Sequence, residues 1–278
     1  MNNLICFVFK MKKPPAGTNP CKGLFRSDNS RIGHLFMNVK PSSQTRPKTT
    51  LFMISSLDGK ISSGDTDELD VDRDWKKIRG VGEGMDQYYQ LEQQTDFVSF
   101  NTGRVMAKIG VNSRPPSKQK SQVSFVLVDN KPHLNEQGLR FLASWLKRVY
   151  VVTSNKKHPA FRLKKELTNI SIILLSKKMD LKKLFYILVK EYKIKRMTIQ
   201  SGGKMNAQLM RDGLIDRVSL VIAPLIVGGS TTPTLVDGES LHHVRELGKL
   251  VPLKLVKIEK LKHSFLHLTY KVIDKSRV

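Results

Sequence analysis

The sequence predicts an α/β domain built on a mixed, mainly parallel central sheet flanked by helices. Three observations support this prediction. From Lys48 onward, strand-like runs rich in β-branched residues alternate with helix-like stretches. The last two runs, 253–260 and 265–272, are joined by a short polar connection without a helix, which predicts a C-terminal antiparallel hairpin. The chain has 278 residues, 40% of them hydrophobic, which is enough for a sizeable core.

The individual elements follow from local pattern. The strands expected before the hairpin are short apolar runs at 49–54, 96–100, 124–128, 149–153, 170–175, 197–200 and 218–223. Helices are expected at 83–94, 135–146, 180–192 and 205–211. The third begins at an acidic cap, Asp180, and repeats Leu181, Leu184 and Leu188 at three- and four-residue spacing. Gly213 supplies a stop after the fourth.

Residues 1–45 differ from the rest of the chain in charge and composition. The folded domain is expected to span 46–278. Residues 1–46 contain eight basic residues and one acidic residue, Asp28, and prolines and small polar residues interrupt each apolar stretch. Neither a secretory signal nor a transit peptide fits this pattern. We expect a disordered basic extension, or a translation start further in at Met11 or Met37.

The charge balance is strongly positive, with 48 Lys and Arg against 24 Asp and Glu. Such a field attracts anions, including nucleic acids. The basic residues occur as scattered pairs, from Lys76-Lys77 to Lys182-Lys183, without a nucleic-acid-binding signature. A solvated Lys-rich surface that steers a phosphorylated small molecule is therefore favoured over a nucleic-acid partner.

Other function classes are excluded by length and cysteine content. The longest apolar runs are about six residues, whereas a membrane-spanning helix needs roughly 20, so no membrane association is expected. Cys6 and Cys21 are the only cysteines, and neither has a partner at zinc-like spacing. We expect no metal site, no zinc-deaminase half and a cytoplasmic, reducing location.

Three predicted strand ends carry glycine, hydroxyl and cationic residues. Ser201-Gly202-Gly203 follows a strand and opens a helix, so its backbone N–H groups suit an anion such as a pyrophosphate; a tight turn without a ligand is the alternative. Asn101-Thr102-Gly103-Arg104 and 153–157 end two further strands. Ligands of open α/β sheets bind at such ends. Gly80 to Gly84 fits no dinucleotide fingerprint, and Ser201 to Lys204 is not a Walker motif.

Three segments then show a family resemblance. Residues 46–61, then 201–206, and then 213–217 with 222–229 resemble, in order, the riboflavin-biosynthesis reductase domain of the RibD C-terminal type, within the dihydrofolate-reductase-like superfamily. The resemblance covers about 46–272. It implies a dihydrofolate-reductase-like fold with NADPH lying across the strand ends, and we expect a homodimer.

The resemblance also implies roles for individual residues. The residues expected to bind the cofactor are Gly103, Arg104, Thr153, Ser154, Lys156, Ser201, Gly202, Gly203 and Asn206. Ser154 and Lys156 would meet the adenosine 2′-phosphate, which favours NADPH over NADH.

In the loop after the first strand, Asp58 would lie beside substrate and nicotinamide, where it could hydrogen-bond the substrate or relay a proton. Ser56 and Lys60 would bind the substrate. The alternatives are an Asx-turn before Gly59 for Asp58 and an ordinary surface lysine for Lys60.

The leading hypothesis is an NADPH-dependent reductase of a phosphoribosylamino-pyrimidine, of the 5-amino-6-(5-phosphoribosylamino)uracil reductase type. The family's Gly-x-x-Thr pattern is replaced by 101–104, and Lys204 stands where a small or hydroxyl residue is expected. The acidic segment 65–74 is either a lid or a solvated loop. A dihydrofolate or pteridine reductase is less favoured, because Tyr88, Tyr89 and Glu92 make an unconvincing acidic pterin anchor. A basic nucleic-acid-associated protein is the third hypothesis.

Overall fold

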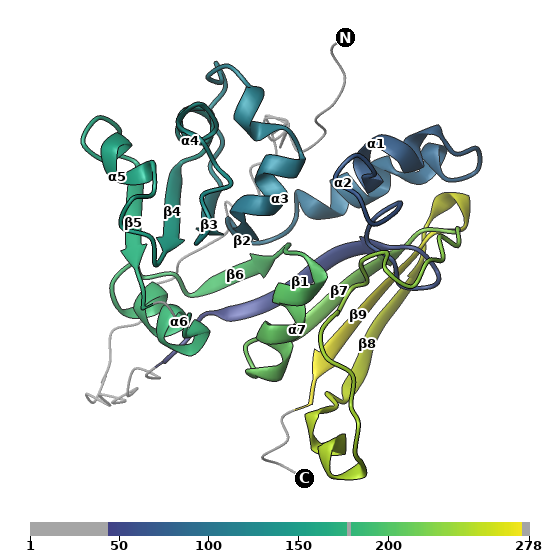
Figure 1. Ribbon diagram of the computed structural model, residues 1–278. Coiled ribbons are helices and arrows are strands. Elements are labelled where there is room, and N and C mark those ends of the chain that lie inside the picture. Colours follow the sequence, from purple (N-terminus) through teal and green to yellow (C-terminus); the bar gives the residue numbers. More distant parts are fainter. Residues whose placement is uncertain (1–43, 177–178, 274–278) are drawn as a thin grey trace, which may run out of the picture.

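A computed structural model describes residues 44–176 and 179–273, so the predicted extension 1–45 lies outside it except for its last two residues (Figure 1). Within the described residues, nine strands form one sheet in the order β5-β4-β3-β2-β6-β1-β7-β9-β8. Strands β1 to β7 are parallel, whereas β9 pairs antiparallel with β7 and β8 antiparallel with β9. The predicted mixed sheet with its closing hairpin is confirmed.

The strands lie within two residues of the predicted runs. They are β1 Lys48–Ser55, β2 Val98–Thr102, β3 Ser124–Val128, β4 Arg148–Thr153, β5 Ile170–Leu174, β6 Arg196–Ile199, β7 Arg217–Ile222, β8 Leu253–Lys260 and β9 Leu266–Val272.

The helices agree less closely with the sequence pattern. They are α1 Val71–Asp74, α2 Asp86–Glu92, α3 Gly103–Lys108, α4 Glu136–Trp145, α5 Ala160–Leu163, α6 Leu181–Lys190 and α7 Gly203–Arg211. Asp180 caps α6 as predicted, because its carboxylate accepts the Lys183 N–H at 2.9 Å. The predicted helix 83–94 is shorter, since Gly82–Gly84 forms a separate 3-10 turn before α2. Helices α1 and α5 were not predicted, because four residues are too few to show a helical period.

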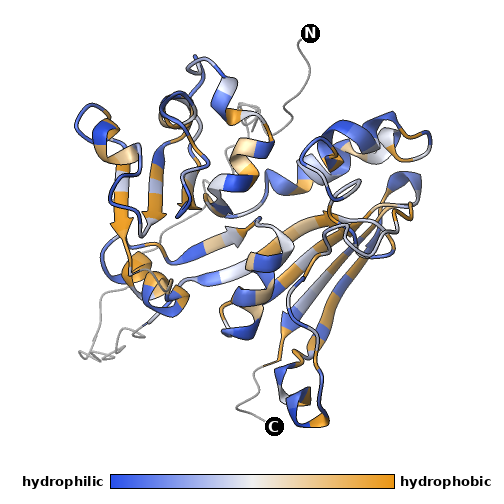
Figure 2. Cartoon of the chain, viewed as in Figure 1, coloured by the Kyte–Doolittle hydropathy of each residue, from blue (hydrophilic) through white to orange (hydrophobic). Residues whose placement is uncertain are grey.

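Three apolar clusters hold the helices against the sheet, and Figure 2 shows strands β4 and β5 as largely hydrophobic. On one face, α6 and α7 pack on the sheet through Phe185 and Leu209. On the other face, α3 and α4 pack over β3 and β4 through Met106 and Leu139. A third cluster, around Trp75, lies under α1 and α2.

The connections change face between two neighbouring strands. Strand β2 leads into α3, which packs with the α4 cluster, whereas the adjacent β6 leads into α7, which packs with α6 on the opposite face. Two helices that diverge from adjacent parallel strands leave a crevice at the carboxyl ends of those strands. We therefore expect a binding site at the carboxyl ends of β2 and β6.

The first strand is fixed by a polar clasp. The Arg46 guanidinium donates two hydrogen bonds to the Asp216 carboxylate, at 2.8 and 2.7 Å, and the Thr49 N–H donates to the same carboxylate at 2.8 Å. Partial burial opposes ionisation of Asp216, but these hydrogen bonds hold its pKa below the usual range. The clasp joins the start of β1 to the start of β7.

We predict that a chain beginning at Gln44 unfolds at the temperature of the full-length chain, whereas a chain beginning at Lys48 does not. The second truncation removes Arg46 and leaves Asp216 partly unpaired, which costs about 1–2 kcal/mol, or roughly 2–8 °C. Calorimetry of the three chains checks this. Equal midpoints for the two truncated chains would contradict the role of the clasp, and a low midpoint for the longer one would show that residues 1–43 are structural.

Candidate functional site

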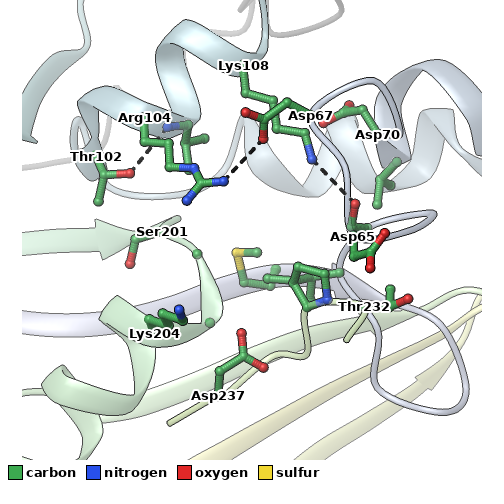
Figure 3. A pocket seen from close by; sticks show the side chains of 18 of the residues that line it. Asp65, Asp67, Asp70, Thr102, Arg104, Lys108, Ser201, Lys204, Thr232 and Asp237 are labelled. Carbon is green, nitrogen blue, oxygen red and sulfur yellow. Dashed lines mark hydrogen bonds and ion pairs between the residues drawn. The ribbon is translucent and has the colours of Figure 1, made fainter. Parts of the chain in front are cut away.

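A cavity of about 640 Å³ opens at the carboxyl ends of β1, β2 and β6, between α3 and α7 (Figure 3). Its size suits a cofactor or a substrate. The walls come from the ends of these strands, from α3, from the N-terminal residues of α7 and from Tyr88 on α2. Two further segments, 61–72 and 230–233, and the single residue Asp237 complete them. Of the three strand ends predicted to bind a ligand, those of β2 and β6 therefore contribute to this cavity.

Ser201, Gly202, Gly203 and Lys204 line the cavity at the N-terminus of α7. A Cβ on Gly202 would meet no atom within 4 Å, so this backbone is open to a ligand. A Cβ on Gly203 would lie 2.2 Å from the Asp237 carboxylate and 2.3 Å from the Thr234 carbonyl. The two glycines thus differ: Gly202 leaves a cradle for an anion, and Gly203 lets the 234–237 loop pack against the helix.

Ser201 and Asn206, both predicted to bind the cofactor, stabilise this turn by hydrogen bonds. The Ser201 hydroxyl donates to Asn206 Oδ1 at 2.7 Å, and Asn206 Nδ2 donates to the Leu235 carbonyl at 2.8 Å. Asn206 is fully buried and does not line the cavity. It positions the turn and touches the cavity only through Ser201.

Helix α3 presents its cations to the cavity from the opposite side. Thr102 caps the helix by accepting the Val105 N–H at 3.3 Å. Arg104 extends into the cavity and pairs with Asp67 at 3.4 Å, and Lys108 donates to Ser62 Oγ at 3.4 Å (Figure 3). Both Asp67 and Arg104 are largely exposed, at 65% and 67% of their side-chain surface, so the pair is weak.

Gly103, by contrast, faces away from the cavity lining. A Cβ on it would lie 2.2 Å from the carboxyl carbon of Asp129. Asp129 is fully buried, and its carboxylate contacts His158 at 3.1 Å and His133 at 2.9 Å. Burial opposes ionisation, but these side chains and two backbone N–H groups hold the pKa of Asp129 below its usual range. Gly103 is needed for this packing, whatever it contributes to a cofactor.

Ser56, Asp58 and Lys60 tie two loops together beside the cavity. Asp58 accepts hydrogen bonds from Ser56 Oγ at 2.5 Å and from the backbone N–H groups of Val227 and Gly228 at 3.1 and 2.7 Å. Lys60 Nζ donates to the carbonyl of Gly229 at 2.6 Å and to a second carbonyl in the same loop at 3.1 Å. The Ser56 hydrogen bond, with the backbone donors, lowers the pKa of Asp58 to about 2.

The third strand end lies farther along the same edge of the sheet. Thr153 is fully buried and accepts the Asn155 N–H, the Ser154 N–H donates to Asn130 Oδ1 at 2.8 Å, and Lys156 is exposed. None of the three predicted residues lines the cavity. Strand β3 separates β4 from β2, and neighbouring strands lie about 4.8 Å apart, so this end is about 10 Å from that of β2.

A row of hydrogen-bonded polar side chains, the polar row, lies under the cavity and was not predicted from the sequence; it consists of Glu92, Gln200, Ser99 and Asn101. Gln200 Nε2 donates to Glu92 at 2.5 Å, Ser99 Oγ donates to Gln200 Oε1 at 2.8 Å, and Asn101 Nδ2 donates to Ser99 Oγ at 3.3 Å. Burial raises the pKa of Glu92 to about 8, against the effect of the Gln200 donor. Alternate polar residues on two adjacent strands were the available signal: Ser99 and Asn101 on β2, Thr198 and Gln200 on or just after β6.

The acidic segment 65–74 forms a wall of the cavity. Asp65, Asp67, Asp70 and Asp72 all line it. Asp72 accepts the Tyr89 hydroxyl at 2.6 Å, and burial together with the nearby Asp70 raises its pKa to about 6 despite that hydrogen bond. A carboxylate with a perturbed pKa in a cavity is a candidate functional group, so Asp72 is one. The sequence alone did not distinguish it from the neighbouring acidic residues.

Metal ligands and membrane spans are both missing from the part of the chain that the structure describes. Within it, no three His, Cys, Asp or Glu side chains lie close enough together to hold a metal ion. Among the same residues, no helix has the length and hydropathy needed to cross a bilayer. The basic pairs Lys76-Lys77 and Lys182-Lys183 belong to different elements, one beside α1 and one on α6.

Comparison with known proteins decides the family. Residues 47–266 match the RibD C-terminal domain. The chain belongs to this family. The predicted resemblance to the riboflavin-biosynthesis reductase domain is therefore confirmed, over nearly the whole of the region 46–272 that the sequence analysis assigned to it.

Curated relatives of this RibD-type chain are named 2,5-diamino-6-ribosylamino-4(3H)-pyrimidinone 5′-phosphate reductase. The protein of Archaeoglobus fulgidus is 22% identical over 229 residues, which cover 79% of this chain and 96% of the relative. Those of Methanothermobacter thermautotrophicus and Aquifex aeolicus are 39% and 30% identical over shorter segments, 20% and 35% of this chain, and the matches span only 26% and 44% of these relatives.

Solved structures share the fold. Acinetobacter baumannii RibD superimposes with a TM-score of 0.58 at 17% identity, covering 84% of this chain and 60% of that one. The riboflavin biosynthesis reductase Rib7 of Saccharomyces cerevisiae gives 0.53 at 17% identity, covering 84% and 93%. These likenesses confirm the dihydrofolate-reductase-like architecture.

The polar row predicts that the stability of the folded chain depends on pH. Because the folded chain raises the pKa of Glu92 to about 8, it holds the proton more tightly than the unfolded chain does. Stability is therefore greatest below the ordinary carboxyl pKa and falls as pH rises toward 8. Glu92→Gln should remove the part of that fall due to Glu92 and leave the part due to Asp72, so that its free energy of unfolding exceeds that of the wild type at pH 8 by more than about 1 kcal/mol.

Urea titrations at pH 5 and pH 8 measure this difference. The matched control is Glu191→Gln, which alters an exposed carboxylate and should leave the pH dependence of the wild type intact. A Glu92→Gln chain that loses as much stability between the two pH values as the wild type would refute a neutral, buried Glu92.

Proposed function

We propose that this RibD-type chain is an NADPH-dependent reductase of a phosphorylated ribosylamino-pyrimidine. The observation that carries the proposal is the open backbone of Gly202 at the N-terminus of α7, inside a cavity that Arg104, Lys108 and Lys204 also line. A helix N-terminus with nearby cations suits the phosphates of a dinucleotide and of a substrate. The names of the curated relatives support the same substrate class.

The cofactor would be held by residues at three strand ends. Its pyrophosphate would lie against Gly202, with Ser201 and Lys204 beside it and Arg104 facing it from α3. The adenosine end would extend along the sheet edge to Ser154 and Lys156, whose hydroxyl and ammonium groups suit a 2′-phosphate. This reach, from β6 past β2 and β3 to β4, is three strand spacings, or about 14 Å. Thr153 and Gly103 support the turns beneath it.

When bound, the reduced nicotinamide would supply a hydride to the sugar carbon that carries the exocyclic amino nitrogen, while the bond from that carbon to the ribose ring oxygen opens and the oxygen takes a proton. The chain's own contribution is mainly positioning. Ser56, Asp58 and Lys60 act through the 227–232 loop, which they hold against the cavity. The geometry supports a positioning role for Asp58 over direct proton transfer, since its carboxylate already accepts three hydrogen bonds.

A second candidate is a pteridine reductase. It is favoured by Asp72, an acidic side chain in the cavity wall on α1, the first helix after β1. The residues weighed from the sequence for such a role, Tyr88, Tyr89 and Glu92, all lie on α2 instead. Dihydrofolate turnover is the measurement that would establish it.

We predict that Gly202→Val abolishes NADPH binding without destabilising the chain. Gly202 has φ −72° and ψ 161°, a conformation open to valine, and a Cβ at this position would have no atom within 4 Å, so folding is unaffected. The added methyl groups occupy the space where the pyrophosphate would approach, and the dissociation constant should rise at least about tenfold, or 1.4 kcal/mol. Fluorescence titration and thermal unfolding of the same sample measure both properties.

The contrasting variant is Gly203→Ala. Its Cβ would overlap Asp237 and the Thr234 carbonyl, so it should cost about 1–3 kcal/mol of stability. A folded Gly202→Val chain that binds NADPH as tightly as the wild type would exclude this cofactor position.

We further propose a homodimer through β8, acting in the cytoplasm. Strand β8 is an edge of the described sheet, and four of its apolar side chains, Leu253, Leu255, Val256 and Ile258, are 40–60% exposed. A long apolar edge strand invites pairing with another chain. Burial against a second copy would cover these side chains without loss of backbone hydrogen bonds.

The dimer predicts a change of mass on substitution. Light scattering should give twice the 31.6 kDa of the chain for the wild type and the single mass for Ile258→Asp, because a buried carboxylate at the interface is unpaired. Lys254→Ser, on the same strand, should remain dimeric. A wild-type chain of single mass would refute the proposal.

A further inference from the structure

Three side chains on the adjacent strands β7, β9 and β8 form a hydrogen-bonded triad outside the cavity (Figure 1). Oγ of Ser219 on β7 lies 2.8 Å from Nε2 of His267 on β9, and Nδ1 of that histidine lies 3.0 Å from Oε2 of Glu259 on β8. A hydroxyl, an imidazole and a carboxylate in this order are the arrangement that activates a serine nucleophile. None of the three is among the described residues that line the cavity, so the proposed reduction does not use them.

The register of the sheet places the triad on one face. Glu259 is directly opposite His267, and His267 is directly opposite Val221. Ser219 lies two residues from Val221 on the same strand and therefore points to the same side of the sheet. The imidazole is held among its neighbours, with 11% of its side-chain surface exposed, whereas Ser219 is only partly buried. A small reagent can therefore approach the serine.

The charge of Glu259 determines which atoms of the triad donate. Lys257 Nζ pairs with Glu259 Oε1 at 2.7 Å, and this contact, followed by that of His267, lowers the pKa of the carboxyl against a smaller opposing effect of burial. An ionised carboxylate only accepts hydrogen bonds, so His267 Nδ1 carries the proton that faces it. Nε2 of the neutral ring is then an acceptor, and the Ser219 hydroxyl donates to it. In this state a histidine acts as general base toward a serine.

A row of cations crosses the same face beside Ser219. Arg217 is directly opposite Lys271, and Lys271 is directly opposite Lys254, so the row spans three adjacent strands. All three side chains are exposed. Like charges in directly opposed positions destabilise a sheet, so the row is stabilised when an anion lies over it. Arg217 is two residues from Ser219, or about 7 Å along the strand, so such an anion would lie beside the hydroxyl.

The backbone around Ser219 restricts the electrophile that can react. In the described sheet β7 pairs with β1 on one side and with β9 on the other, so its backbone N–H groups are used by the ladder and are not available as an oxyanion hole. Attack without that stabilisation requires an acyl group with a good leaving group. An acyl phosphate has one, and its phosphate is the anion that the cationic row suits.

We propose that Ser219, with His267 as its general base and Glu259 orienting the imidazole, accepts an acyl group from an acyl phosphate. The bond from Oγ to the acyl carbon forms as the bond from that carbon to the phosphate oxygen breaks. The serine proton passes to His267 Nε2 and then to the departing phosphate, and nothing is oxidised or reduced. The product is an O-acylserine, which accumulates because its hydrolysis also lacks an oxyanion hole.

The experiment incubates the full-length chain with acetyl phosphate and locates acetyl groups by mass spectrometry after trypsin digestion. Cleavage after Arg217 and Arg245 releases a peptide, 218–245, that contains no lysine, so acetylated lysines do not interfere. Ser240 is exposed in the same peptide and serves as the internal reference. Ser219 should react about 100-fold faster than Ser240, the acceleration that a general base supplies. Alkaline hydroxylamine should remove the acetyl group, as it does from an ester.

Three variants test the triad. His267→Gln should slow acetylation of Ser219 to the rate of Ser240, because an amide can accept the hydroxyl hydrogen bond but cannot take the proton. Glu259→Gln, at a partly exposed position, should slow it at least about tenfold and tests the triad even if the buried substitution unfolds the chain. The matched control His242→Gln changes an exposed histidine and should leave the rate unchanged.

The acyl donor is tested with a second probe. Arg217→Gln should slow the reaction with acetyl phosphate and leave the reaction with the uncharged p-nitrophenyl acetate unchanged, because only the first donor carries an anion for the cationic row. Equal effects on both probes would overturn the assignment to acyl phosphates.

The remaining outcomes separate this inference from the proposed function. Acetylation of Ser219 no faster than that of Ser240, or undiminished in both His267→Gln and Glu259→Gln, would overturn the inference. Ser219→Ala should lose the modification and bind NADPH as the wild type does, because the triad lies outside the cavity. A failure of the proposed cofactor site would leave the acetylation of Ser219 unchanged.

Discussion

The divergence of α3 and α7 from adjacent strands is the constraint on which the rest of the molecule depends. Because β2 and β6 are paired and their helices pack on opposite faces, neither helix can cover the end of the other's strand. The gap becomes the cavity, which is lined by the N-terminal residues of α7 and by the side chains of Arg104 and Lys108 on α3 (Figure 3). Any anion that enters meets backbone N–H groups at the N-terminus of α7 and the cationic side chains of α3.

The same divergence explains why the apolar core is interrupted. On the face that carries α3 and α2, one cluster covers β3 and β4 and another covers β1 and β7, while β2 and β6 between them carry polar side chains. Burying Ser99, Asn101, Gln200 and Glu92 costs free energy unless each is hydrogen-bonded. In the polar row every one of these side chains is hydrogen-bonded, and the one acceptor without a donor is Asn101 Oδ1, at the end nearest the cavity. That oxygen is itself shielded from solvent, and no described residue donates to it.

The sequence was sufficient to predict the sheet, since parallel strands buried on both faces, such as 124–128, are continuous apolar runs. It could not separate Gly202 from Gly203, because the difference is made by a loop more than thirty residues away. Nor could it distinguish Asp72 from its acidic neighbours, whose solvation is the ordinary expectation for such a run. For Asp58 the sequence offered a turn or a site, whereas the carboxylate also binds two N–H groups of a loop 169 and 170 residues later. Spacing along the chain cannot reveal such a contact.

Charge acts at two scales in this chain. The whole molecule carries +24, a field that raises the rate at which anions arrive. The cavity wall reverses this balance locally, with Asp65, Asp67, Asp70, Asp72 and Asp237 against Arg104, Lys108 and Lys204. The exposed Asp67–Arg104 pair is weak enough for a doubly charged phosphate to displace, so the cations of α3 remain available to it. The acids on the α1 side repel a second anionic group from that part of the cavity. The charge distribution therefore directs a phosphate toward α3 and α7 and away from α1.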